Sequence, residues 1–596
     1  MVETRKSLAA LGLCASAFML TSATPARQIS VSAETLRQRD PSMQMLQACG
    51  GARRGEALRD RIKFAMTLSP STIPAQTEPV LVPGLASVHY PVTTSNELAQ
   101  RYFDQGLALI YGFNHVEAIR YFRHAQTLDP ECAACWWGEA FAHGPNINAP
   151  MDPEVNAQAM KAAQTALSLK GKADPAEQAL IDAVATRYAA DPKADRAALD
   201  KAFADQMLAV AQRFPADDTV AVLAAEAVMD TQPWDYWEAD KRTPKGGIKD
   251  AIALVETVLA RNPDHPQADH LYIHLLEASA NPAKAEPYAD RLAKPLVPAA
   301  GHLVHMPGHL YYRVGRFKDA IRVNVDAARI DEDYLKSSKE AGLYRFGYYP
   351  HNVHFIVTSA QMAGDMTTAV TEARKLSTIL NTDLSAAMPW VQPVDAAPYL
   401  AYAQFSTPAE ILALKAPDAR LPYVTGMWHY ARAIAYAQRK DRKKFAKEIA
   451  AIRHIRETTD FKPMADQLVP ADDLLRLAET VAQARLAYAR GRYRDAVTLY
   501  RQAAAIEDTV RYMEPPFWYY PVRQSLGAAL YRTRDFTGAR QAFLEALAQA
   551  PNNGWALYGL MTAQTALGDR AGASATEAAF GRAWSGPANW LTMDRL

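Results

Sequence analysis

The chain has 596 residues, of which 49% are hydrophobic and 22% charged, values that are typical of a soluble globular protein. Its 65 Lys and Arg against 64 Asp and Glu give a net charge of +1, which argues against a partner that is nucleic acid or an anionic membrane surface. The 10 Trp, 27 Tyr and 18 Phe exclude a largely disordered chain. At roughly 150 residues per domain, the length allows several domains or one long repeat array.

The first 26 residues have the pattern of a signal peptide. Arg5 and Lys6 form a short basic region, residues 7–23 carry no charge, and Ala26 ends a small-residue cleavage site. The pattern predicts a periplasmic or secreted protein with no membrane span after cleavage; an uncleaved N-terminal anchor is the alternative. Residues 27–95 are predicted to form an N-terminal helix and then a linker rich in Pro, Ser and Thr.

A 34-residue pattern begins near residue 96. Gly106 and Ala118 take its positions 8 and 20, and Phe122 takes position 24. Ala125 and Pro130 follow at positions 27 and 32. Small residues at 8 and 20 let two antiparallel helices approach closely, an aromatic ring at 24 fills the gap, and the proline ends the second helix. The pattern resembles the tetratricopeptide repeat (TPR).

The same frame recurs along the chain. Gly308 and Ala320 occupy positions 8 and 20 of one unit, and Gly527, Ala539 and Phe543 occupy positions 8, 20 and 24 of another. The resemblance to the TPR superfamily covers roughly residues 96–584. It implies an all-α fold, a TPR-like α-solenoid of antiparallel helix pairs.

Two regions depart from the repeat pattern. Residues 150–260 match it poorly, but show apolar 3.6-residue periodicity over residues 154–167, 175–190, 197–214 and 219–229. Residues 386–425 hold six prolines and are predicted to be an insertion. We therefore expect an N-terminal TPR-like array over residues 96–385, this Pro-rich insertion, and a C-terminal TPR array over residues 426–596.

Three cysteines remain after signal cleavage. Cys132 and Cys135 form a CxxC pair, and Cys49 is left over. The pair is compatible with a disulfide, a redox pair or metal ligands. Two small residues buried in a helix are an equally simple reading of the same spacing.

Histidines are concentrated in the middle of the chain. Eight of the 14 lie within residues 265–354, where composition alone predicts about two. They are His265, His270, His274, His302, His305, His309, His351 and His354.

Most of these histidines share one register. By resemblance to the TPR superfamily, the first helix of each unit lines the concave groove through positions 2, 5, 9, 12 and 13. In the frames set by Ala285, Ala320 and Ala369 at position 20, one glutamate and seven of the eight histidines fall on these positions. They are His270, His274, Glu277, His302, His305, His309, His351 and His354. We take these eight residues as candidate metal ligands.

The residue types indicate a transition metal. Neutral imidazole binds copper, zinc or iron, and the i, i+4 spacing of His270 and His274 lets one helix chelate an ion. The intervening residues lack the glutamate of a zinc-protease HExxH helix. The whole set suffices for two metals, or for one metal and a proton-transfer pair. Glu277 is either a ligand or an acceptor that orients a histidine.

Three segments of the sequence are rich in aromatic residues. Residues 344–349 directly precede His351 and are a candidate lid whose tyrosines bind a ligand. The segments at 233–237 and 514–520 each wall a small-molecule pocket or pack across the seams between repeats.

Two functions follow from these patterns. The first is an exported TPR protein whose groove carries a His-rich copper, zinc or iron site, as in a metal-dependent oxidoreductase or hydrolase with a small-molecule substrate. The second is a non-catalytic scaffold that binds a peptide or an envelope protein in the groove. The stretches 301–309 and 349–354 resemble those of a group of exported bacterial TPR proteins, which implies fold and export but no activity.

Overall fold

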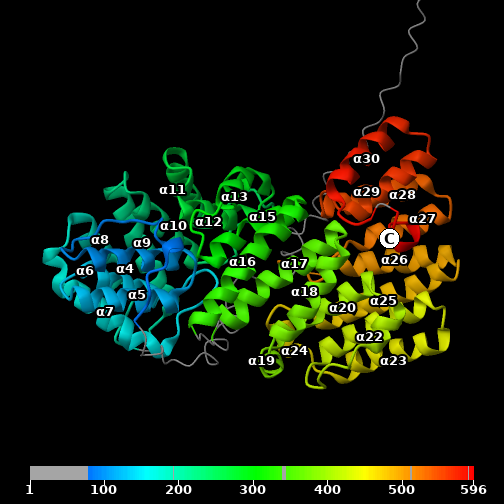
Figure 1. The fold of residues 1–596 in the computed structure, drawn as a ribbon, viewed down its shortest axis with the longest axis horizontal. Coiled ribbons are helices and arrows are strands. Elements are labelled where there is room, and N and C mark those ends of the chain that lie inside the picture. Colours follow the sequence, from blue (N-terminus) through cyan, green and yellow to red (C-terminus); the bar gives the residue numbers. More distant parts are fainter. Residues whose placement is uncertain (1–77, 192–193, 339–341, 343, 511–512, 588) are drawn as a thin grey trace, which may run out of the picture.

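The computed structural model describes residues 78–596, except 192–193, 339–341, 343, 511–512 and 588. The predicted signal peptide, the N-terminal helix and the first part of the linker lie outside the described residues. The described residues form helices, with two isolated bridges and no strand (Figure 1). Within this part of the chain, each helix is too short or too polar to cross a bilayer.

The first half of the array runs from residue 83 to residue 379. Its helices are η1 (Pro83–Leu85), α4 (Glu97–Tyr111), α5 (His115–Leu128), α6 (Ala133–Ala142), η2 (Pro153–Val155), α7 (Asn156–Leu169), η3 (Lys170–Lys172), α8 (Pro175–Ala185), α9 (Arg196–Arg213), α10 (Asp218–Asp230), α11 (Ile248–Arg261), α12 (Pro266–Glu277), η4 (Pro282–Ala285), α13 (Glu286–Leu292), α14 (Gly301–His305), α15 (Pro307–Val314), α16 (Phe317–Ser338), the π-helical turn η5 (Tyr344–Tyr348), α17 (Tyr349–Ala363) and α18 (Met366–Ile379).

The second half continues to the C-terminus. Its helices are α19 (Thr382–Ala387), η6 (Pro389–Val391), α20 (Gln392–Phe405), α21 (Pro408–Ala413), α22 (Pro422–Gln438), α23 (Arg442–Thr458), α24 (Lys462–Asp466), α25 (Ala471–Ala489), α26 (Tyr493–Glu507), α27 (Val522–Arg532), α28 (Phe536–Gln549), α29 (Gly554–Ala566), α30 (Arg570–Ala583) and η7 (Met593–Arg595). Residues 386–425, predicted to be an insertion, thus carry helices, and α20 packs against α17, α18 and α22.

The helix pairs cross where the repeat frame predicts small residues. The buried ring of Phe122 lies between two glycines, and a Cβ atom would come within 2.8 Å of it at Gly106 and within 2.5 Å at Gly138. Phe543 packs in the same way between Gly527 and Gly559. One aromatic side chain therefore closes each of these crossings, and only glycine leaves room for it.

Short polar side chains start the second helix of several pairs. Each accepts a hydrogen bond from a backbone N–H of the first turn, which satisfies a donor that the helix itself cannot pair. These N-terminal caps are Asn114, Asp365, Asp441, Asp535 and Asp569. The four segments of weak repeat character at 154–229 also form the expected helices, α7 to α10.

The C-terminal end of the array returns to its middle. The indole Nε1 of Trp555 donates to the carbonyl of Gln361 at 2.8 Å, and the ring of Trp584 packs on Gly364. Figure 1 shows α29, in red, near α17, and the two helices are in contact. This return brings residues 513–521, which lead into α27, against the first half of the array. This segment covers part of the candidate site described below.

Candidate metal centre

Three histidines from two helices form a first triad. His270 and His274 lie one turn apart on α12, and His302 lies on α14. One nitrogen from each ring falls within 4.8 Å of the others, and the Nε2 atoms of His270 and His302 are 3.2 Å apart. The predicted i, i+4 pair on α12 therefore converges with a third imidazole.

A second triad lies beside the first. It joins His305 at the end of α14, His309 on α15 and His351 on α17. Their ligand nitrogens also lie within 4.8 Å of one another, and the Nε2 atoms of His309 and His351 are 3.3 Å apart. The stripe of three histidines predicted on one helix is thus divided between His302 and His305, although both lie on α14, because each joins rings from a different neighbouring helix.

The triads are buried rather than open to a groove. The most exposed ring among the five fully buried histidines, that of His309, has 4% of its surface exposed, and only His351 is partly exposed. The expectation that these side chains line an accessible concave groove is therefore wrong for five of them. Neighbouring helices and the returning C-terminal segment cover the positions that an open solenoid would leave to solvent.

Oxygen acceptors hold the Nδ1 atoms of four of the six imidazoles. Gln267 donates its amide to Glu226, so its Oε1 is left to accept from His270 Nδ1 at 3.0 Å. Glu277 Oε1 accepts from His274 Nδ1 at 2.9 Å. Such contacts place the proton on Nδ1 and leave the Nε2 lone pair free for a metal.

The second triad is held in the same way. Asn324 Oδ1 accepts from His305 Nδ1 at 2.5 Å, and Asn324 is itself fixed because its amide donates to the carbonyl of Ala320. His309 Nδ1 lies 2.9 Å from Glu277 Oε2 and 2.5 Å from Glu514 Oε2. Glu277 therefore touches one ligand of each triad.

Within the six triad rings, three buried imidazole nitrogens have no hydrogen-bond partner among the described residues. They are Nε2 of His274, Nε2 of His305 and Nδ1 of His302. A buried polar atom without a partner costs roughly 1–3 kcal/mol, so such atoms usually have one. At His274 and His305 the unpaired atom is Nε2, while Nδ1 is held by an oxygen acceptor, so Nε2 is the nitrogen left for a ligand.

Burial sets the protonation of the rings. It lowers the pKa values of His270, His274, His302, His305 and His351 well below the usual range, helped in all five by other histidines. These five rings are neutral, the form that binds metal. For His309 burial also acts downward, but the carboxylates of Glu277 and Glu514 raise its pKa to about 10. A metal in the second triad must therefore displace one proton.

One phenylalanine ring covers each triad. Phe113, from the α4–α5 turn, lies 4.7, 6.1 and 5.1 Å from the ring centres of His270, His274 and His302. Phe355, from α17, lies 5.2, 4.8 and 5.0 Å from those of the second triad. Each triad therefore packs against one aromatic ring as well as against the polar side chains that hold its Nδ1 atoms.

Two of the covering aromatic residues have unusual backbones. Phe113 and Trp234 have φ angles of 54° and 63°, in the left-handed region that bulky residues rarely adopt. Phe113 takes position 15 of its repeat, the turn between paired helices, where Gly315 and Arg534 also have positive φ, so its backbone belongs to the repeat. The Trp234 ring lies 5.0 Å from that of His274. The 233–237 segment thus walls the site.

The other aromatic segments also lie at the site. The Tyr348 ring is 5.0 Å from that of His302, so the predicted lid segment covers the first triad. Tyr344 instead donates its hydroxyl to the buried Asp331 at 2.7 Å. From the 514–520 segment, Glu514 reaches His309 and Tyr519 reaches His354.

Two candidate ligands take other positions. The Nε2 of His354 lies 2.7 Å from the Tyr519 hydroxyl, outside both triads. Glu277 orients His274 and His309, and with His309 and Glu514 it forms a third group close enough to hold an ion. The sequence reasoning missed Gln267, Asn324 and Glu514. Asn324 had a signal: it takes position 24, where Phe122 and Phe543 stand in regular units.

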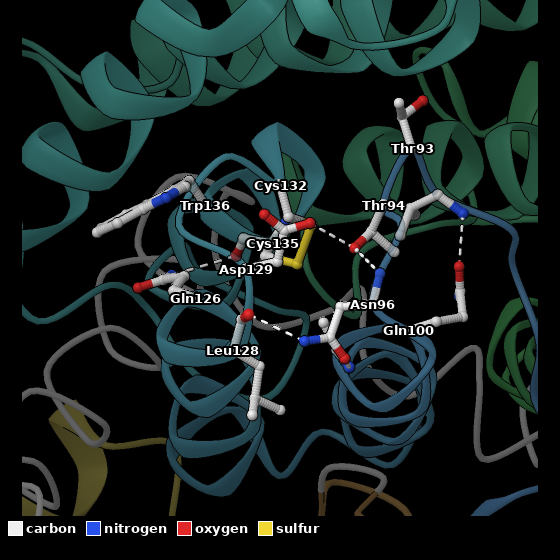
Figure 2. Close-up of a disulfide and its surroundings, with 12 residues drawn as sticks. Thr93, Thr94, Asn96, Gln100, Gln126, Leu128, Asp129, Cys132, Cys135 and Trp136 are labelled. Carbon is white, nitrogen blue, oxygen red and sulfur yellow. Dashed lines mark hydrogen bonds between the residues drawn. A yellow bond between two sulfur atoms is a disulfide. The ribbon is translucent and has the colours of Figure 1, made fainter.

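The two cysteines of the CxxC pair are bonded to each other. Cys132 and Cys135 form a buried disulfide at the start of α6, where Gln126 donates to the carbonyl of Cys135 (Figure 2). Asp129, which precedes the pair, accepts from the Thr94 hydroxyl. In this state the sulfurs are not metal ligands, and they belong to neither triad.

Repeated helix pairs, closed at their crossings by small residues, define an all-α solenoid of the TPR type. No protein-family model matches the chain, and no curated protein matches it. Among solved structures, it is similar to a human IFIT1 dimer with m7Gppp-AAAA, at 10% identity and a TM-score of 0.27 over 92% of this chain and 98% of that one. Yeast Tom70 matches at 10% identity and a TM-score of 0.25, over 80% and 90% of the two chains. The TPR domain of P58(IPK) matches at 12% and 0.22, over 79% and 98%. The assignment rests on the helix pairs themselves, because these scores are low.

Proposed function

We propose that the protein binds two transition-metal ions, one in each histidine triad. The observation that carries this proposal is the orientation of the rings: oxygen acceptors hold Nδ1 in four of six imidazoles, so their Nε2 atoms are available to the triads. Histidines that ligate metals almost always make this second contact.

The spacing of the nitrogens supports the same proposal. Two imidazole nitrogens at about 2.0–2.1 Å from one metal in tetrahedral geometry lie about 3.3 Å apart. The Nε2 pairs His270–His302 and His309–His351 are 3.2 and 3.3 Å apart. Three protein ligands leave a fourth position for water or substrate, which is the composition of a catalytic metal site. The donors suit copper, zinc or iron, and the chemistry that follows is oxidation or hydrolysis.

Burial argues against a peptide as the partner of these histidines. The fold is that of repeat scaffolds, but an extended chain in a groove cannot reach side chains whose surfaces are covered. A small molecule or an ion is therefore the ligand that we assign to the triads.

Export completes the proposal. The basic start, uncharged stretch and small-residue cleavage site of residues 1–26 support a periplasmic or secreted location. N-terminal sequencing of the protein recovered from the periplasm or the medium tests it. A mature chain that begins near residue 27 is the expected result, and a chain retained with its N-terminus intact contradicts it.

Elemental mass spectrometry tests the metal proposal. The mature protein is purified without a histidine tag, and we expect about two equivalents of copper, zinc or iron, one per triad. The variant His270→Ala/His305→Ala removes one ligand from each triad and is expected to lose both. The exposed His454 gives the matched control, since His454→Ala is expected to retain the metal. Absence of metal after reconstitution with all three ions would refute the proposal.

A further inference from the structure

The two triads touch each other. Ring centres of ligands in different triads, His274 to His309 and His302 to His305, are both 5.9 Å apart. Within a triad the corresponding distances run from 4.6 to 6.2 Å. The two oxygens of Glu277 also contact one ring of each triad, so a single carboxylate spans them. Two metals bound here are neighbours that can share one small ligand.

The donors favour copper over the other two metals. Each triad consists of three imidazole nitrogens, and the nearby carboxylates of Glu277 and Glu514 contact Nδ1 atoms of its rings. Non-haem iron oxygenases use two histidines and a carboxylate, which neither triad provides. At equal donor sets Cu²⁺ binds more tightly than Zn²⁺ or Fe²⁺. A pair of three-histidine sites is thus best matched to two copper ions.

The surroundings of the triads act on copper in two opposite ways. Phe113 and Phe355 each contact all three rings of one triad, and apolar cover favours the lower charge of Cu(I). The carboxylates of Glu277 and Glu514 beside His274 and His309 favour the higher charge of Cu(II). A copper ion held here thus has support in both oxidation states.

We infer that the paired triads bind two copper ions that, as Cu(I), take up one molecule of dioxygen between them. Each Cu(I) gives one electron and becomes Cu(II), and dioxygen becomes a bound peroxide. The O–O double bond becomes a single bond, no proton moves, and release of dioxygen reverses the step. This inference rests on the proposed function, since it needs a metal in both triads.

Oxygen uptake by the copper-loaded protein tests the inference. The metal-free mature protein is loaded with two equivalents of Cu(I) under argon, and limiting dioxygen is added. We expect one dioxygen consumed per two copper ions, with an intense near-ultraviolet charge-transfer band. We also expect no Cu(II) signal in electron paramagnetic resonance, because two adjacent Cu(II) ions couple magnetically.

Variants that damage a single triad test whether dioxygen uptake needs both triads. His305→Ala and His270→Ala each damage one triad, and each is expected to keep about one copper, lose dioxygen uptake and show an isolated Cu(II) signal after chemical oxidation. His454→Ala is expected to behave as the parent protein. Two bound copper ions without dioxygen uptake, or tight zinc with no copper bound, would overturn the inference and leave the proposed function standing. Failure to bind any metal would overturn both.

Discussion

Glu277 connects the two triads. Its side chain is buried, and its two oxygens accept hydrogen bonds from His274 and His309. An acceptor on Nδ1 fixes the tautomer and makes Nε2 a stronger donor to a metal. One carboxylate therefore orients a candidate metal ligand in each of the two triads.

Replacing this carboxylate tests its role. In Glu277→Gln one oxygen becomes an NH₂ group, which meets the Nδ1–H of one histidine donor to donor. We expect metal affinity to fall by about 10–100-fold in at least one triad. Competition against a chromophoric chelator measures it. Glu457→Gln, at an exposed position, is the matched control. Equal affinities in the two variants would contradict the role we assign.

Asn324 shows what a repeat frame reveals about a single residue. Regular units have an aromatic ring at position 24, as at Phe122 and Phe543, whereas this unit has an amide that orients His305. A polar residue at a core position needs a partner, so the departure itself points to the site. Gln267 and Glu514 carry no such signal, because nothing in the sequence places them next to His270 and His309.

Partner helices decide which histidine joins which triad. His302 and His305 lie on the same helix, α14, but His302 meets the rings of α12 and His305 meets His351 of α17. Pro307 begins a new helix, α15, yet its His309 shares a triad with His305, so the break does not set the division. Register predicted the histidines as a group, but it could not predict this division.

A buried acid ties α16 to α17. Asp331 on α16 accepts hydrogen bonds from Tyr344 and from Asn352, both at 2.7 Å. Burial raises the pKa of Asp331 to about 7, against its usual value of about 4. The folded protein therefore holds a proton here that the unfolded chain releases above about pH 4.

The resulting pH dependence has a definite sign. Between about pH 4 and pH 7 the folded state binds more protons than the unfolded state, so this group makes stability fall with rising pH, by at most about 1.4 kcal/mol per pH unit. Asp331→Asn removes the titration. We expect the variant to gain stability relative to the parent between pH 5 and pH 7.5, in denaturant unfolding. The exposed Asp383→Asn is the control. If the stability difference between Asp331→Asn and the parent is the same at pH 5 and pH 7.5, the account is contradicted.

At the scale of the whole molecule, the return of the C-terminal array completes the site. Trp555 and Trp584 fasten α29 and α30 to the end of α17. The same return brings Glu514 to His309 and Tyr519 to His354. The second triad is thus closed by residues about 200 positions further along the chain.

Loosening this contact tests its effect on the site. In Trp584→Ala the loss of a buried indole is expected to cost about 3–5 kcal/mol of unfolding free energy. It is also expected to speed hydrogen exchange in α17 and in residues 513–521. Thermal unfolding and exchange mass spectrometry measure the two effects. Trp136→Ala, half-buried and in the N-terminal array, is the control for exchange at α17. Unchanged exchange there would show that the contact does not support the site.

The sequence by itself determined the helix pairs, their glycine crossings such as Gly106 with Phe122, and the group of histidines that face inward. These features are local, since they depend on periodicity and on residues within one or two repeats. The tertiary structure alone decided that the histidines form two adjacent triads, that Glu277 spans them, and that Glu514 closes the second. Those contacts depend on how distant helices pack, and the repeat pattern carries no information about the turn that brings the chain back on itself.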